Sequence, residues 1–125
     1  MNDRPLLVFD FDGVIVDGMA EYWWSAWHAC RRLEAAPEGL TPDQVPDAFR
    51  QLRPWVHHGW EMVLLAAELP VLNLQVWLES YGDAQASALQ RRGWRPEQLQ
   101  AALDDARDQA VRQSRSAWLA LHRPF

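Results

Sequence analysis

The stretch LLVFDFDGVIVDG, which begins at Leu6, constrains the fold more than any other part of the chain. It opens with an uninterrupted apolar run that follows Pro5 and ends at Asp10. Four apolar residues between a proline and a glycine-containing turn predict a short strand, and a run without polar alternation is typical of a parallel strand covered on both faces. Asp10 is therefore expected at the carboxyl end of a strand, the edge at which open α/β sheets bind ligands.

The residues after this strand carry the elements of a phosphate or metal site. Asp12 lies two positions beyond Asp10, and Gly13 permits a sharp turn with close approach of the backbone. Carboxylate and backbone oxygens are the ligands that Mg²⁺ prefers. Two carboxylates in different surroundings can also divide roles, one as an ionised nucleophile and the other as a proton donor.

From residue 18 onward the hydrophobic period becomes that of α-helices. Trp23, Trp27, Cys30 and Leu33 recur at spacings of four, three and three, which predicts a helix to about residue 33. The capping-box spacing at Thr41 predicts a helix start there, limited to one turn because Pro46 would cost that helix a backbone hydrogen bond. Further helices are expected from Pro46 to about 53, from Pro54 to about 69, and at 73–80, 83–92 and 96–122, the last with Leu99, Leu103, Ala106 and Ala110 on its buried face.

Three other features have simple structural interpretations. Adjacent residues on a helix point about 100 degrees apart, so His57 and His58 are better suited to a helix start than to holding one metal ion. Cys30 lies on an apolar helical face, where an inert buried thiol is expected. Most of the eight tryptophans recur at helical spacing with Leu, Val and Ala, which indicates a hydrophobic core.

Composition excludes several classes of protein. The net charge is −5 and the 12 basic residues, all arginine, are interspersed with acids, so neither a nucleic-acid stripe nor a polybasic membrane patch is expected. No window approaches the roughly 20 apolar residues of a membrane span. A single cysteine, Cys30, favours a reducing compartment. These features predict a cytoplasmic protein.

Residues 6–17 resemble the first motif of the haloacid dehalogenase-like (HAD) hydrolase superfamily, a hydrophobic strand followed by Asp-x-Asp-Gly-Thr or Val and then often another Asp. The resemblance implies that Asp10 is the nucleophile that forms an aspartyl-phosphate and that Asp12 is the general acid/base. The Asp10 carboxylate and the Asp12 backbone carbonyl would ligate Mg²⁺, while Gly13 and Asp17 would form and order the turn. The true dehalogenases lack an aspartate at the position of Asp12, so the resemblance implies phosphoryl transfer.

The remainder of the chain is similar to a C1-type helical cap, most closely of the phosphoglycolate phosphatase-like branch. The implied parent fold is α/β with a Rossmann-like core, of which residues 1–17 supply the first strand and catalytic loop. This chain would be mostly α, with residues 18–125 forming the cap. Arg50 and Arg53 are candidates for binding an anionic substrate from the cap, although surface arginines are more often simply solvated.

The family also uses a second-strand Ser or Thr, a Lys or Arg, and a later acidic pair, none of which this sequence supplies at a strand end. We therefore expect an N-terminal fragment that is inactive by itself. The complete protein is expected to be a Mg²⁺-dependent phosphomonoester hydrolase acting on a small phosphorylated metabolite. A β-phosphoglucomutase-like activity stays open. So does a non-catalytic helical module that retains the loop vestigially and binds a partner through its Trp-rich surface.

Overall fold

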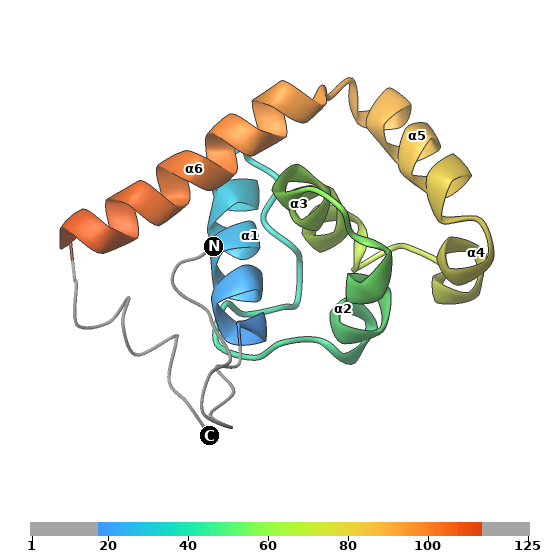
Figure 1. The fold of residues 1–125 in the computed structure, drawn as a ribbon, viewed down its shortest axis with the longest axis horizontal. Coiled ribbons are helices and arrows are strands. Elements are labelled where there is room, and N and C mark those ends of the chain that lie inside the picture. The colour runs from blue at the N-terminus through green and yellow to red at the C-terminus, as the bar shows by residue number, and fades with distance from the viewer. Residues whose placement is uncertain (1–17, 114–125) are drawn as a thin grey trace.

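The computed structural model describes residues 18–113, which form a set of helices joined by short loops (Figure 1). In chain order these are α1 (Met19–Arg32), α2 (Asp47–Leu52), the 3₁₀ turn η1 (Arg53–Trp55), α3 (Gly59–Glu68), α4 (Leu74–Glu79), α5 (Tyr81–Arg92) and α6 (Pro96–Gln113). No strand occurs within residues 18–113. The mostly helical class is thus confirmed for this part, whereas the strand predicted at 6–9 lies outside the described residues.

Helix α1 is built on the apolar face that its spacing predicts. Trp23, Ala26 and Cys30 are fully buried along that face. The loop that follows α1 runs back beside it, because the indole Nε1 of Trp23 donates a hydrogen bond to the Thr41 carbonyl at 2.7 Å. The Trp27 indole makes the equivalent bond to the next carbonyl back along the chain at 3.0 Å. The helix therefore fixes both the core and the path of its own connecting loop.

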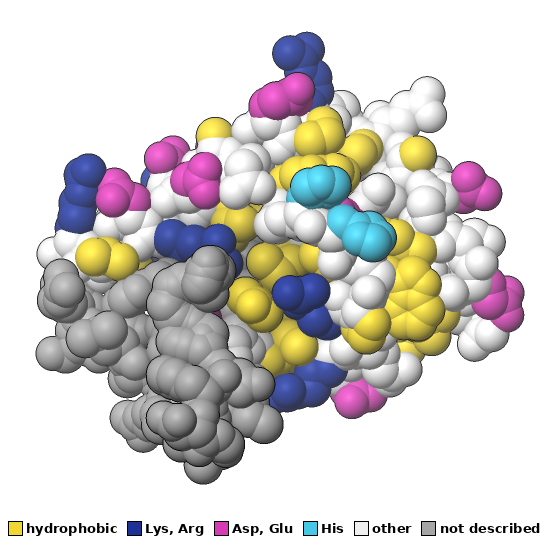
Figure 2. Space-filling model, viewed as in Figure 1, with side chains coloured by type: hydrophobic (Ala, Val, Ile, Leu, Met, Phe, Trp, Pro, Cys, Tyr) yellow, Lys and Arg dark blue, Asp and Glu magenta, His cyan; other side chains and the backbone are white. Residues whose placement is uncertain are grey.

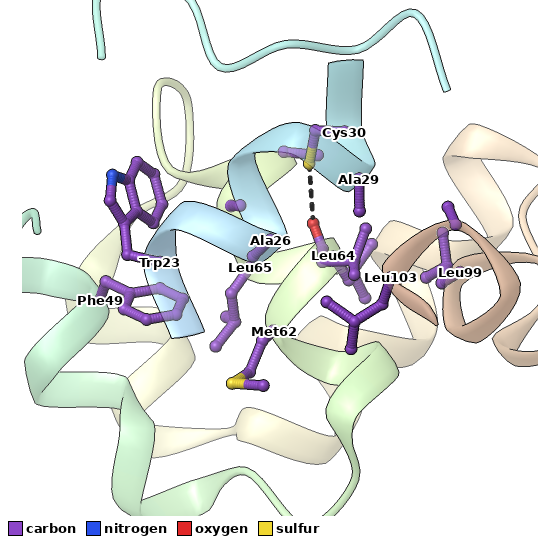
Figure 3. Packing of buried hydrophobic residues seen from close by; sticks show 14 of the residues in the cluster. Trp23, Ala26, Ala29, Cys30, Phe49, Met62, Leu64, Leu65, Leu99 and Leu103 are labelled. Atoms are coloured by element: carbon purple, nitrogen blue, oxygen red, sulfur yellow. Dashed lines mark hydrogen bonds between the residues drawn. The ribbon is translucent and has the colours of Figure 1, made fainter. Parts of the chain in front are cut away.

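The core lies where α1, α3 and α6 pack on one another (Figure 3). The three helices contribute fully buried side chains from each direction, including Cys30, Leu64, Leu65, Leu99 and Leu103. The Cys30 Sγ donates to the Val63 carbonyl at 3.2 Å, the bond drawn dashed in Figure 3. The thiol is fully buried, as the apolar spacing predicts, and burial raises its pKa to about 12.

The single helical turn predicted at Thr41 is not formed, whereas the helix restart predicted at Pro46 is confirmed. Residues 41–45 form turns, and α2 begins only after Pro46, whose extended backbone (φ −67°, ψ 146°) supplies the N-cap. Two prolines within five residues deprive a helix of the amide donors that its first turns need. The Thr41 carbonyl is instead an acceptor for the Trp23 indole.

The prediction that one helix begins at Pro54 is also wrong. The chain forms a single 3₁₀ turn at Arg53–Trp55. Val56 and His58 are then extended, and α3 begins at Gly59. Gly59 is the first residue of α3. A Cβ at this position would lie 3.0 Å from the Leu103 Cδ2 atom, so glycine permits the close approach of α3 to α6.

The remaining helices follow the predicted boundaries closely. The Asn73 side chain accepts a hydrogen bond from the Val76 amide at 3.2 Å and so caps α4 as expected. Helix α5 ends at Gly93, whose left-handed backbone (φ +68°) favours glycine. Figure 1 shows α4 and α5 together at one end of the molecule, with α6 lying along α1 and α3. The predicted extension of α6 to residue 122 lies outside the described residues.

Candidate functional site

The predicted site residues divide into two groups. Asp10, Asp12, Gly13 and Asp17 lie outside residues 18–113, whereas both candidate arginines of the helical part lie inside. Helix α1 begins at Met19, directly after the predicted catalytic loop. The N-terminal end of α1 is therefore the described part of the chain that the loop joins.

Arg53 packs against this end of α1. Its guanidinium carbon lies 4.7 Å from the centre of the Tyr22 ring, and Tyr22 occupies the first turn of α1, five positions after Asp17 in the sequence. Such a cation–π contact contributes about 0.5–2 kcal/mol, depending on how far the pair is desolvated. Arg50, three residues earlier, lies on α2 and is exposed. The structure thus brings Arg53, rather than Arg50, against the residues that follow the loop.

Within residues 18–113, no carboxylate pairs with the Arg53 guanidinium. Its Nε atom is buried and has no hydrogen-bond acceptor. No ion pair or side-chain hydrogen bond is formed by Arg53 with any residue in the described range. Leaving a buried donor unsatisfied costs about 1–3 kcal/mol. Arg53 therefore occupies a place where an added acceptor would be stabilising.

A buried carboxylate fixes the segment that follows Arg53. Glu61 is only 3% exposed, and its Oε2 atom accepts from the backbone N–H groups of His58 at 2.8 Å and His57 at 3.1 Å. Its Oε1 atom accepts from the Tyr81 hydroxyl at 2.9 Å and from the Gln85 amide at 3.0 Å. Residues 56–58 are thereby tied to both α3 and α5, while the two imidazoles remain exposed. This confirms the expected role of the histidine pair at a helix start.

The electrostatics of this network favour an ionised Glu61. Burial alone raises the pKa of the carboxyl group, but the hydrogen bonds from Tyr81 and from His57 and His58 outweigh it, so the pKa is lowered. The pKa of the Tyr81 phenol is raised, mainly by burial and by its bond to Glu61, with a smaller opposing contribution from the Arg53 charge. Glu61 is satisfied by these donors and forms no ion pair with Arg53 within the described residues.

Neither Glu61 nor Tyr22 stands out as a site residue in the sequence. Glu61 lies in a predicted helical run and reads as an ordinary surface acid, and Tyr22 as part of an amphipathic helix. The only signal for Glu61 was its position three residues after His58, the spacing at which a Glu side chain reaches back to an N-cap amide. Figure 2 shows histidine and arginine side chains gathered among hydrophobic ones on the face it displays.

An open pocket of about 460 Å³ lies elsewhere, between α1 and α6. Its wall includes Trp24 and His28, whose rings are 4.1 Å apart, and Arg32, which donates to the Gln109 side chain. Desolvation and the charges of Arg31 and Arg32 lower the pKa of His28, against a smaller opposing effect of Asp43. None of the predicted site residues lines this pocket.

No protein-family model, curated protein or solved structure was found to match the chain. Within residues 18–113, no three His, Cys, Asp or Glu side chains come together in a way that would hold a metal ion. No helix in the same range combines the length and apolar character needed to cross a bilayer. The functional assignment therefore depends on the residues of the chain itself.

Proposed function

We propose that this chain carries the catalytic loop and cap of a Mg²⁺-dependent phosphomonoester hydrolase of the HAD-like superfamily, acting on a small phosphorylated metabolite in the cytoplasm. The observation that carries the proposal is the motif at residues 6–17, an apolar run followed by Asp10, Asp12, Gly13 and Asp17. The parent fold would be an α/β core, to which residues 1–17 contribute the first strand.

The two aspartates of the motif have different tasks in this proposal. The Asp10 carboxylate attacks the phosphorus atom, the ester oxygen leaves, and an aspartyl-phosphate forms. Asp12 protonates the leaving oxygen and then removes a proton from the water that hydrolyses the intermediate. The Asp10 carboxylate and the Asp12 carbonyl would hold Mg²⁺, which supplies charge neutralisation at the phosphoryl oxygens.

The described residues support the cap half of the proposal. A helical unit begins at Met19, immediately after the motif, as expected for an insertion at this point. Within that unit the unpartnered Arg53 lies against the first turn of α1. The exposed Arg50 on the neighbouring helix is a second candidate for the same anion. The cap thus offers a cation near the point at which the loop enters it.

The test is hydrolysis of a generic ester, p-nitrophenyl phosphate, by the product of the complete reading frame that contains residues 1–125. Turnover should require Mg²⁺ and should fall by at least about 10³-fold in Asp10→Asn, because a carboxamide is not a nucleophile toward phosphorus. The matched control is Asp105→Asn, an exposed aspartate on α6 whose replacement should leave turnover unchanged.

Undiminished turnover in Asp10→Asn would remove Asp10 as the nucleophile. Absence of any Mg²⁺-dependent turnover would favour the alternative of a helical interaction module. Among residues 18–113, the large exposed apolar side chains on which such a module could draw are Trp55, Val71 and Val76. Residues 1–125 by themselves are expected to show no turnover, because phosphoryl transfer also needs cationic groups and further acids around the phosphate.

A further inference from the structure

We propose that the pocket between α1 and α6 is a binding site for a nucleoside monophosphate, a ligand that joins a flat ring to a phosphate. The pocket has a volume of about 460 Å³ and is lined by side chains of both helices. This volume lies within the range of about 300–1,000 Å³ that is typical of small-molecule sites. None of the predicted site residues lines the pocket, so the inference does not depend on the proposed hydrolase activity.

Two aromatic side chains of α1 form the part of the wall that would hold the ring. Trp24 and His28 lie one turn apart on the helix, with their ring centres 4.1 Å apart and their planes tilted by 39°. The Trp27 ring also contacts the imidazole, edge-on at 4.9 Å, so His28 is held in position from a second side. Trp24 and His28 are both partly exposed, and a heterocyclic base can stack on such a surface.

Two arginines in the last turn of α1 form the cationic side of the pocket. Arg31 has no ion pair or side-chain hydrogen bond in the described part of the chain, and the side-chain partner of Arg32 there is the uncharged amide oxygen of Gln109. No carboxylate lines the pocket, although the chain has a net charge of −5. Asp43, whose charge acts on His28, is not among the lining residues. Two positive charges exceed the roughly half negative charge at the carboxyl end of a helix, so an anion is favoured here.

The positions of the two arginines favour a phosphate over a carboxylate. Neighbouring residues of a helix point about 100 degrees apart, so Arg31 and Arg32 approach the pocket from different directions. A phosphate monoester presents three acceptor oxygens in different directions, whereas a carboxylate presents two in one plane. A guanidinium is permanently charged and pairs closely with phosphate oxygens.

Helix α6 supplies the opposite wall. Ala106 and Ala110 lie one turn apart on it, and their small side chains leave room between the helices. Gln109, on the same wall, has an amide group that can donate to the edge of a base. The pocket therefore combines a stacking surface, two cations and an amide, which match the ring face, the phosphate and the ring edge of a nucleotide.

The first experiment uses the 125-residue chain and is independent of turnover. The tryptophan indole N–H signals are followed by ¹⁵N NMR while AMP, GMP, CMP and UMP are added separately at constant ionic strength. The Trp24 signal, assigned by its loss in Trp24→Phe, should shift saturably with at least one of them. The signal of Trp55, which does not line the pocket, is the internal control. No saturable shift at Trp24 with any of the four nucleotides, or an equal and unsaturated shift at both indoles, would overturn the site.

The second experiment separates the ring from the phosphate by calorimetric titration, with the nucleotide that shifts Trp24 most, its nucleoside and ribose 5-phosphate as ligands. The nucleoside and ribose 5-phosphate, which each carry one half of the nucleotide, should bind at least about 10-fold more weakly than the nucleotide itself. In the double variant Arg31→Gln/Arg32→Gln, the affinity for the nucleotide should fall to that for the nucleoside, whereas Trp24→Ala should weaken both ligands alike. Arg95→Gln, an exposed arginine outside the pocket, is the matched control and should change neither affinity.

Two results would overturn the assignment of the ligand class. Binding of ribose 5-phosphate as tightly as the nucleotide would show that the aromatic wall recognises no ring. An unchanged affinity of the double variant for the nucleotide would show that Arg31 and Arg32 bind no phosphate, and would leave them as cations that stabilise the carboxyl end of α1.

Discussion

Buried polar groups have hydrogen-bond partners in the interior between α1, α3 and α6. They are less completely bonded at the Arg53 corner, the place where Arg53 lies against Tyr22. In the interior, Glu21 is 4% exposed and its carboxylate accepts from Ser25 at 2.5 Å and from the Arg107 Nε at 2.8 Å. At the corner, Arg53 has a buried Nε without an acceptor. Buried polar groups in proteins are nearly always hydrogen-bonded, so the unmatched one points to a role other than stability.

The same contrast holds between Arg53 and Glu68, a buried glutamate on α3. Glu68 is 1% exposed and is bound by Arg91 at 2.9 Å and by Arg92 at 2.5 Å. Burial raises the pKa of Glu68, but the hydrogen bonds from these two arginines outweigh it and the pKa is lowered. Glu21 and Glu68 are therefore paired with arginines from α6 and α5, whereas Arg53 has no anionic partner among residues 18–113.

The largest expected effect tests whether the three-helix interior carries the stability. Leu103 is fully buried on α6 and packs against the start of α3. Leu103→Ala should lower the free energy of unfolding by about 2–5 kcal/mol, because it leaves a cavity in close-packed surroundings. Urea unfolding followed by tryptophan fluorescence measures this change. The control Val71→Ala, at a 73% exposed position, should change it by less than about 0.5 kcal/mol. A loss below about 1 kcal/mol in Leu103→Ala would contradict the assignment of the core.

A smaller loss of unfolding free energy is expected when the buried Glu21 carboxylate loses its partner Arg107. Arg107→Met leaves the Glu21 carboxylate with only the Ser25 hydroxyl among its described partners, and should cost about 1–3 kcal/mol in unfolding free energy. The double variant Glu21→Leu/Arg107→Met should recover part of that loss, since it removes the orphaned charge as well. Unchanged stability in the single variant would show that the pair contributes nothing.

The Glu61 network predicts a pH dependence. The folded-state pKa of Glu61 is lowered from its ordinary 4.5, so its contribution is fully present above pH 4.5 and is lost as the pH falls through the lower, folded-state value. Unfolding free energies measured from pH 7 to pH 3 should decline more steeply for the wild type than for Glu61→Gln, because the glutamine amide does not take up a proton in this range. Glu68 titrates in the same direction in both proteins. Parallel curves would mean that Glu61 is not held ionised.

The smallest effect is expected at Arg53 itself, and it tests directly how Arg53 differs from an arginine that is paired. Arg53→Met removes the contact with Tyr22, but it also removes the unsatisfied Nε, and these two effects oppose each other, so the unfolding free energy should fall by no more than about 1 kcal/mol. The same substitution at position 107 provides the matched reference. Equal losses at the two positions would place Arg53 among the residues that stabilise the fold and would remove the physical argument for a ligand.

The apolar periodicity predicted the helices well where local and tertiary preferences agree. Helix α1, the Asn73 cap of α4, the Gly93 end of α5 and the buried face of α6 at Leu99, Leu103 and Ala106 all lie where the spacing placed them. The errors fall at Thr41 and at Pro54. At both positions a local helix signal competes with side chains from elsewhere in the chain, the Trp23 indole in one case and Glu61 in the other.

By itself the sequence determined the helical class of residues 18–113 and the buried position of Cys30, because both follow from apolar spacing within one segment. The assignment of Asp10 and Asp12 also stays with the sequence, as a prediction. Only the tertiary structure separated Arg53 from Arg50. Both are arginines three residues apart, and their difference arises from the approach of Tyr22, some thirty residues earlier, which no local pattern encodes.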